Sequence, residues 1–400
     1  MEGARTRGHP AALAAVASMI RGGAPHAVLL VGPPGIGKTT LALDLAAGLL
    51  CTADDVADRP CGMCRACRLV AAGVHPDLHR LGPEGPGRQV VIGGPGARAH
   101  GIRDLILELA LLPVEAGARV AIIEAAHRMN EDAQAALLKT LEEPPAGVTL
   151  ILCADAEESL LPTIRSRCAR LRLGPVGTRE VEAILGEHGV ADPPLAARLA
   201  RIAAGRPGLA LAWARQPEAL RARDELSRSL LDLLGSRAAE RLAGVRSAMA
   251  RAASLTALND GAGDDAASGT TAAARTAAAP AVEPAPSDTI DPGATAEDEV
   301  GPAIRTPAAE RRRAAEALVG LWTDVARDLA LCRRGLDRSV RDLGLLDETA
   351  AAATGLDAHE LDRFLDRLGR ASVLIVGNVS PELVLDDLAL AWPRPAAAAA

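Results

Sequence analysis

Four cysteines lie close together in one segment, at the spacing C-x9-C-x2-C-x2-C: Cys51, Cys61, Cys64 and Cys67. Each Cys-x2-Cys step places two sulfurs on one tight turn, as Zn–S bonds of about 2.3 Å require. Four thiolates complete a tetrahedral site and leave no open position, so the metal would be structural and not catalytic. The pattern predicts a structural Zn²⁺ site; reduced structural thiols or a redox site are the alternatives.

A second motif precedes the cysteines and reads GPPGIGKT at 32–39, which matches G-x4-G-K-[ST] at every fixed position. Its glycines let backbone N–H groups converge on phosphates at a helix N-terminus, Lys38 adds positive charge, and Thr39 can ligate Mg²⁺. We therefore expect an ATP/Mg²⁺ site, with a relic loop that no longer binds nucleotide as the alternative. The predicted nucleotide-binding residues are Gly32, Pro33, Pro34, Gly35, Ile36, Gly37, Lys38, Thr39 and Thr40.

Hydrolysis at such a loop also needs a second strand that ends in carboxylates, one to hold Mg²⁺ and one to orient the attacking water. The best candidate is Glu124, which follows the apolar run 120–123 and is added to the predicted nucleotide site. The next residue is Ala125, which has no acid–base chemistry. ATP hydrolysis by this chain itself is therefore doubtful, and a solvated strand-end residue is the alternative for Glu124.

Arg165 and Arg167 end a helix-like stretch shortly after the apolar run 148–153. Arginines at such an edge are usually solvated. They can also reach the nucleotide of a neighbouring subunit, where one guanidinium stabilises charge on the transferring phosphate. The residues alone leave both roles open.

The remaining cysteines and the nearby histidines suggest no further site. Cys153, Cys168 and Cys332 have no partners at ligand spacing and are expected to be small buried residues. Four sulfurs already complete the metal site, so we expect His75 and His79 to lie at the surface.

The composition limits the class of protein. With 400 residues the chain is long enough for two or three domains, and 49% apolar residues can fill their cores. Residues 260–307 hold nine acidic and two basic residues, a net charge of −7, which is the net charge of the whole chain. The rest of the chain is therefore close to neutral, and no basic character indicates an autonomous nucleic-acid binder. Clustered cysteines fit a reducing compartment, and neither a signal peptide nor a span of about 20 apolar residues is evident. We expect a cytoplasmic protein.

Residues 1–175 alternate strands and helices. Apolar runs of strand length occupy 27–31, 120–123 and 148–153, and helices are expected at 39–50 and after Asn130, a predicted cap. Near-continuous apolar strands that alternate with helices predict an α/β fold with a parallel sheet covered on both faces.

The rest of the chain is predicted to be helical. A small helical segment covers 176–215, with Thr178 as the expected cap of a helix from 179 to 187, and further helices cover 216–254 and 308–390. The segment 255–307 has almost no large apolar residues and is expected to be a disordered acidic low-complexity insertion. Residues 391–400 are expected to form a flexible tail.

These motifs together resemble the clamp-loader AAA+ family, most closely the delta-prime subunits of bacterial DNA polymerase III. The resemblance covers about 1–215 and rests on GPPGIGKT, on CGMCRAC at 61–67, on His75-Pro-Asp77, on ALLKTLEEPP at 136–145 and on Ser166-Arg167-Cys168. It implies a P-loop AAA+ domain over 1–175 with the zinc module at 51–67 inserted, a helical lid over 176–215, and an all-α collar.

The resemblance also implies partners and a role. Family members work with gamma/tau and delta subunits to load the sliding clamp onto primed DNA, so primed DNA would be bound through the complex. It identifies Arg167 as the arginine finger that acts in trans. The gamma/tau motors have Asp-Glu where this chain has Glu124-Ala125, a sensor Thr near Ala154-Asp155, and a lid arginine at the place of Gly208. These departures favour a stator that belongs to the polymerase III holoenzyme. A gamma/tau-like active ATPase and a zinc-stabilised nucleotide-sensing adaptor outside replication are the alternatives.

Overall fold

The computed structural model describes residues 3–83, 89–94, 97, 99–115, 117–267, 308–377 and 379–395. For residues 258–267 it describes the backbone only. Five strands form one parallel sheet in the order β2-β3-β4-β1-β5. Their bounds are β1 Ala27–Val31, β2 Leu78–Leu81, β3 Arg119–Ile123, β4 Val148–Ala154 and β5 Ala169–Arg172. The predicted strands at 27–31, 120–123 and 148–153 are confirmed to within one residue.

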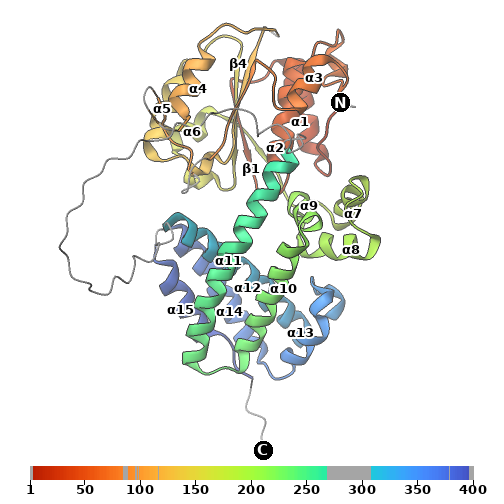
Figure 1. Cartoon of the computed structure of the whole chain (residues 1–400), viewed down its shortest axis with the longest axis vertical. Helices are drawn as coiled ribbons and strands as arrows, with labels where there is room; N and C mark the ends of the chain where they lie inside the picture. The colour runs from red at the N-terminus through yellow and green to blue at the C-terminus, as the bar shows by residue number, and fades with distance from the viewer. Residues whose placement is uncertain are drawn as a thin grey trace, which may run out of the picture.

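Helices cover both faces of this sheet (Figure 1). One face packs against α1 Pro10–Gly22, α2 Lys38–Leu50 and α3 Arg65–Ala71, and the other against α4 Ile102–Leu109, α5 Glu131–Glu142 and α6 Pro162–Arg167. Neighbouring residues of one strand point to opposite faces, so Val28 and Leu30 join the first core while Ala27 and Leu29 join the second. Burial on both faces explains why these strands read as continuous apolar runs.

Helix α5 begins where the sequence predicts it. The backbone N–H of Ala133 donates to Asn130 Oδ1 at 2.9 Å, which satisfies one of the free donors of the first turn. We expect Asn130→Ala to lower the free energy of unfolding by about 1 kcal/mol, measured by urea denaturation, because the cap is lost. Asn130→Asp keeps an acceptor at the same place and is the matched control; equal stability of the two variants would contradict the capping role.

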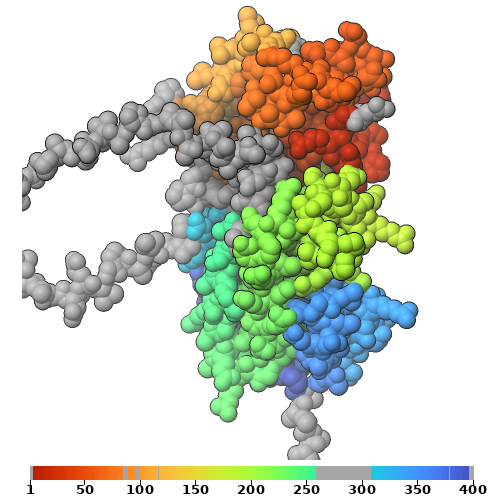
Figure 2. All heavy atoms as spheres, turned by 45° about the vertical axis from the view of Figure 1, so that its right-hand side comes forward, coloured from red at the N-terminus to blue at the C-terminus, as the bar shows by residue number. Residues whose placement is uncertain are grey.

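The described residues beyond the sheet form helices. They are α7 Thr178–Glu187, α8 Pro193–Ile202, α9 Pro207–Arg215, α10 Pro217–Asp232, α11 Ala238–Ala267, α12 Ala308–Arg333, α13 Leu346–Ala353, α14 Ala358–Val376 and α15 Pro381–Ala391. Buried side chains from Val176 to Trp392 belong to one apolar cluster, so α7 to α9 share a core with the later helices. In Figure 2, the yellow-green segment α7–α9 lies between the sheet half above and blue helices below.

Two expectations about this region are wrong in part. Helix α11 continues to Ala267, so residues 255–267, assigned to the insertion, are helical; Leu255 is still buried, and the alanines after it favour helix. Thr178 is the first residue of α7 and does not cap it; the backbone N–H of Gly177 is instead satisfied by Glu180 Oε2 at 3.3 Å. The rest of the predicted insertion, 268–307, lies outside the described residues.

The chain end also differs from the prediction of a flexible tail. Trp392 is 2% exposed and packs edge-on against Trp322 and at a tilt against Phe364, with ring centroids 5.4 and 4.6 Å away. Its Nε1 donates to the carbonyl of Leu230 at 3.0 Å, and Arg241 donates to its carbonyl oxygen. Burial of so large a ring fixes the chain as far as Trp392. The last five residues, 396–400, lie outside the described part.

Candidate functional site

The predicted phosphate loop connects β1 to α2. The chain leaves the sheet at Val31 and starts the helix at Lys38, so residues 32–40 have the strand–loop–helix context that a phosphate loop requires. Gly35 and Gly37 have φ of +75° and +108°, which residues with a side chain rarely adopt. The loop therefore has the backbone form that its sequence predicts.

The ammonium group of Lys38 is fully engaged inside the protein. Its Nζ donates to the carbonyls of Gly32 at 2.7 Å and Pro33 at 3.0 Å, and to Asp155 Oδ1 at 2.7 Å. Lys38 is 8% exposed, so this ion pair is largely shielded from water. The charge that would meet a phosphate is balanced by a carboxylate of the same chain.

Asp155 is in turn held by His127. The backbone N–H of Asp155 donates to His127 Nδ1 at 3.2 Å, and His127 Nε2 lies 3.3 Å from Asp155 Oδ2. Burial lowers the pKa of His127 and outweighs the opposing effect of Asp155, so the ring is neutral at pH 7 with its proton on Nε2. Neither residue was predicted as a site residue.

Glu124 directly follows β3, as predicted, but it faces a cation. Its Oε1 accepts from Arg80 Nε at 2.9 Å and from Arg80 NH2 at 2.5 Å, both from the neighbouring strand β2. Ala125 after it has φ of +51°, so the chain turns sharply at the point where a motor would carry its second acid. Asp155 and Glu124 are therefore each paired with a cation of this chain.

Helix α9 closes the other side of the loop. The backbone N–H of Gly208 donates to the carbonyl of Gly35 at 2.8 Å. A Cβ added to Gly208 would lie 3.0 Å from that oxygen and 3.2 Å from Gly35 Cα. An arginine at this position would require the helix to move away from the loop. A cavity of about 230 Å³ remains beside the loop, bounded by Gly32, Asp155, Glu157 and Arg172 among others.

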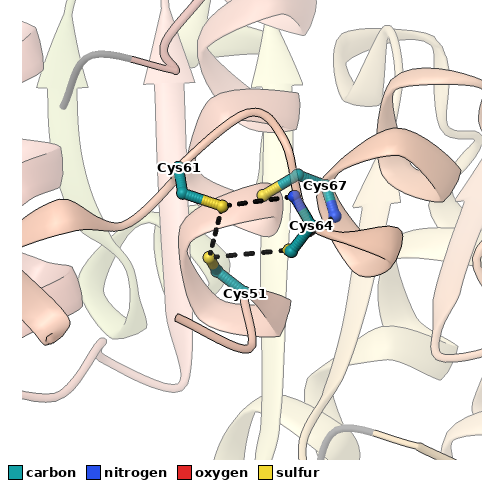
Figure 3. A group of neighbouring side chains, drawn as sticks. All are labelled: Cys51, Cys61, Cys64 and Cys67. Atoms are coloured by element: carbon teal, nitrogen blue, oxygen red, sulfur yellow. Dashed lines mark hydrogen bonds between the residues drawn. The ribbon is translucent and has the colours of Figure 1, made fainter. Parts of the chain in front are cut away.

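The four predicted metal ligands come together (Figure 3). Cys51 Sγ lies 3.6 Å from Cys61 Sγ and 3.8 Å from Cys64 Sγ, and the four sulfurs lie within 4.8 Å of one another. Sulfurs at the corners of a tetrahedron around zinc at about 2.3 Å are about 3.8 Å apart, so the donor set fits a four-thiolate zinc ion. Cys51 follows α2, Cys64 is the N-cap residue of α3, and Cys67 lies in the first turn of that helix.

Local hydrogen bonds favour the thiolate form of Cys64. Burial raises its pKa, but hydrogen bonds from the backbone of Cys67 and Thr52 outweigh burial and lower the pKa to about 6. A thiol with this pKa loses its proton readily to a metal.

His75 and His79 are not surface residues, contrary to the expectation. His75 is 2% exposed, and its Nδ1 accepts from the backbone N–H of Asp77. His79 lies in β2, where Nδ1 is 2.8 Å from Glu108 Oε2 and Nε2 is 3.1 Å from Arg119 NH1. Their positions next to or within a buried strand explain this. Cys153 and Cys168 are buried as expected, and Cys332 is half-buried.

Arg167 is the last residue of α6 and lies at the surface, with 34% of its side chain exposed. NH2 lies 2.7 Å from Glu142 Oε1, at the end of α5, and NH1 donates to the carbonyl of Thr163 at 3.0 Å. An exposed ion pair of this kind contributes about 0–1 kcal/mol, so the guanidinium can be released at little cost.

Comparison with known proteins gives the same family that the motifs indicate. Residues 8–177 match the family described as DNA polymerase III, delta subunit. The chain is 43% identical to DNA polymerase III subunit delta' of Pseudomonas aeruginosa over 145 residues, 36% of this chain and 42% of that protein. It is 36% identical to subunit delta' of Escherichia coli over 197 residues, 49% of this chain and 57% of that one.

A differently named subunit is also similar: DNA polymerase III subunit tau of Escherichia coli is 34% identical over 185 residues, 45% of this chain and 27% of that protein. The chain thus spans about half the length of the curated delta' relatives it matches. Within the described residues, no helix is long and apolar enough to cross a membrane. Residues 8–177, which include the phosphate loop and the four cysteines, are therefore similar to the family described as DNA polymerase III, delta subunit.

Proposed function

We propose that this chain is the delta-prime subunit of a bacterial DNA polymerase III clamp loader. It works in the cytoplasm as a stator, together with gamma/tau and delta subunits, in the complex that loads the sliding clamp onto primed DNA. Contact with the DNA is made by the assembled complex. The observation that supports a stator over a motor is that Lys38 and Glu124 are both neutralised by residues of the same chain, Asp155 and Arg80.

The proposed domains follow the same family. Residues 1–175 are the AAA+ P-loop domain with the zinc module at 51–67, residues 176–215 the lid, and residues 216–254 with 308–390 the collar. The apolar core that joins α7–α9 to α10–α15 supports a lid fixed to its collar. Such a unit moves little during a nucleotide cycle, as a stator requires. Zn²⁺ bound by the four thiolates is structural in this proposal, and ATP/Mg²⁺ is an optional ligand.

Arg167 acts in trans in this proposal. Released from Glu142, its guanidinium reaches the ATP of the adjoining motor subunit and stabilises charge on the transferring phosphate. The exposed position of Arg167 and its weak internal pairing support this role.

Reconstitution with gamma/tau and delta subunits tests both the proposed assembly and the proposed role of Arg167. We expect this chain to assemble with them, and Arg167→Ala to lower the DNA-stimulated ATP turnover of the complex in part, since one site loses its finger. Arg170→Ala, an exposed arginine on β5, is the control and leaves turnover unchanged. Unchanged turnover with Arg167→Ala makes Arg167 an ordinary surface residue. Failure to assemble favours an adaptor outside replication.

A gamma/tau-like ATPase is the second candidate, because the phosphate loop keeps every fixed residue and the strand–loop–helix context. ATP turnover of the isolated chain separates the two. Appreciable turnover that Lys38→Ala abolishes would exclude the stator, whereas turnover equal to that of Lys38→Ala supports it.

A further inference from the structure

The phosphate loop already holds a carboxylate where it would hold a phosphate. An ammonium group has three N–H donors, and all three of Lys38 have acceptors, two loop carbonyls and Asp155 Oδ1. A phosphate oxygen can reach Nζ only if one of these acceptors gives way. Among these acceptors, Asp155 is the one that carries a negative charge and lies outside the phosphate loop, directly after β4.

The fold holds Asp155 in this position. It follows β4 directly, and the last residue of β4, Ala154, is in register with Val31, the last residue of β1 before the loop. His127 fixes the second carboxylate oxygen, since its Nε2 lies 3.3 Å from Oδ2. Asp155 thus has a cation on one oxygen and an N–H donor on the other. Its side chain is 28% exposed and borders the cavity beside Gly32.

We propose that Asp155 is an internal competitor of the nucleotide and sets the affinity of this loop for ATP. The lysine of a phosphate loop contacts the β- and γ-phosphates, so these groups must displace the Asp155 carboxylate or lie within a few ångströms of it. Like charges at that separation repel strongly in a partly buried site. Asp155 therefore weakens the binding of ATP and ADP. It does not weaken the binding of AMP, because the single phosphate of AMP does not reach Lys38.

The inference concerns nucleotide binding by this chain and is separate from the action of Arg167 in trans. We would measure binding of ATP, ADP and AMP with Mg²⁺ to the full chain by isothermal titration calorimetry. Asp155→Asn keeps the shape and removes the charge, and we expect it to bind ATP about tenfold more tightly than the unmodified chain. AMP binding stays the same. Asp155→Ala, which also removes the acceptor, gives a gain at least as large.

Two variants control the experiment. Glu143→Gln removes an equal charge from an exposed residue outside the site and leaves ATP binding unchanged. Adding Lys38→Ala to Asp155→Asn cancels the gain, because the freed ammonium is then absent. The inference is wrong if Asp155→Asn binds ATP no more tightly than the unmodified chain, if the gain survives Lys38→Ala, or if no variant binds ATP at millimolar concentration. These results concern ATP binding by this chain, whereas the action of Arg167 in trans is tested separately by the Arg167→Ala complex.

Discussion

Replacing Cys64 with serine is expected to remove the zinc and to lower the free energy of unfolding by about 5 kcal/mol or more. Binding free energy becomes folding free energy when a site does not exist in the unfolded chain, and in zinc-finger peptides it is about 10–16 kcal/mol. Here part of the module is also held by packing, since Cys51, Cys67 and Val70 are buried against the sheet domain. Zinc content by elemental analysis and thermal unfolding by circular dichroism measure both effects.

Cys332→Ser is the matched control, because Cys332 is a half-buried thiol of α12, far from the module in sequence and lacking ligand spacing. It should keep one equivalent of zinc and lose little stability. A chelator should lower the melting temperature of this control and of the unmodified chain, but not of Cys64→Ser. Less than about half an equivalent of zinc in the unmodified chain, or equal melting of the two serine variants, would contradict a four-thiolate site.

The module also fixes the start of the chain. The backbone N–H of Gly3 donates to the carbonyl of Pro60, and a Cβ on Gly3 would lie 2.4 Å from the backbone nitrogen of Gly62. Asp44 in α2 accepts from the backbone N–H groups of Arg5 and Thr6. Loss of the metal is therefore expected to release the N-terminal segment at residues 3–6 as well. This segment lies on the face of the sheet that α2, the helix after the phosphate loop, covers.

Local features of this fold are predictable from the sequence. The strand at 27–31, the loop at 32–37 and the helix after it follow one another along the chain, so apolar runs and glycines suffice to place them. The cysteine ligands are equally local, because all four lie within 17 residues from Cys51 to Cys67. The Asn130 cap is local too, because its partner, the backbone N–H of Ala133, lies three residues later in the chain.

Pairings between distant strands are not predictable in this way. Asp155 meets Lys38 because β4 lies beside β1, and Arg80 meets Glu124 because β2 lies beside β3. The order β2-β3-β4-β1-β5 decides both, and hydrophobic periodicity carries no information about strand order. A signal for Asp155 was nevertheless present, since a charged residue directly after a buried parallel strand lies at the ligand-binding edge of the sheet.

Replacing Asp342 with asparagine is expected to lower the free energy of unfolding by about 3 kcal/mol at pH 7, because the buried Arg223 loses its closer counter-ion and keeps only Asp224, 3.4 Å away. Asp342 Oδ2 lies 2.6 Å from Arg223 NH1, and Oδ1 lies 3.2 Å from Arg198 Nε. Arg198 comes from α8 and Arg223 from α10, so this carboxylate joins the proposed lid to the proposed collar. Urea denaturation followed by circular dichroism measures the loss.

The pH dependence separates the ion pairs from simple packing. Burial raises the pKa of Asp342, but Arg223 and Arg198 outweigh it and hold the pKa below 3.8. A carboxylate with a lowered folded-state pKa stabilises the protein above its unfolded pKa and loses that contribution as the pH falls through the folded value. The difference between the unmodified chain and Asp342→Asn should therefore be full at pH 7 and shrink as the pH falls below about 4.

Asp386→Asn is the control for a surface ion pair. Asp386 lies 3.2 Å from Arg246, whose side chain is 69% exposed, and such pairs contribute about 0–1 kcal/mol. A loss at Asp342 no larger than this would mean that the Asp342 ion pairs contribute little, and that packing and the Arg198–Asp224 pair hold α8 to α10. A loss that stays constant down to about pH 3 would point to shape and not charge. A fixed joint between these helices, supported by ion pairs, is what the proposed stator role needs if the chain's own phosphate loop is not to drive motion.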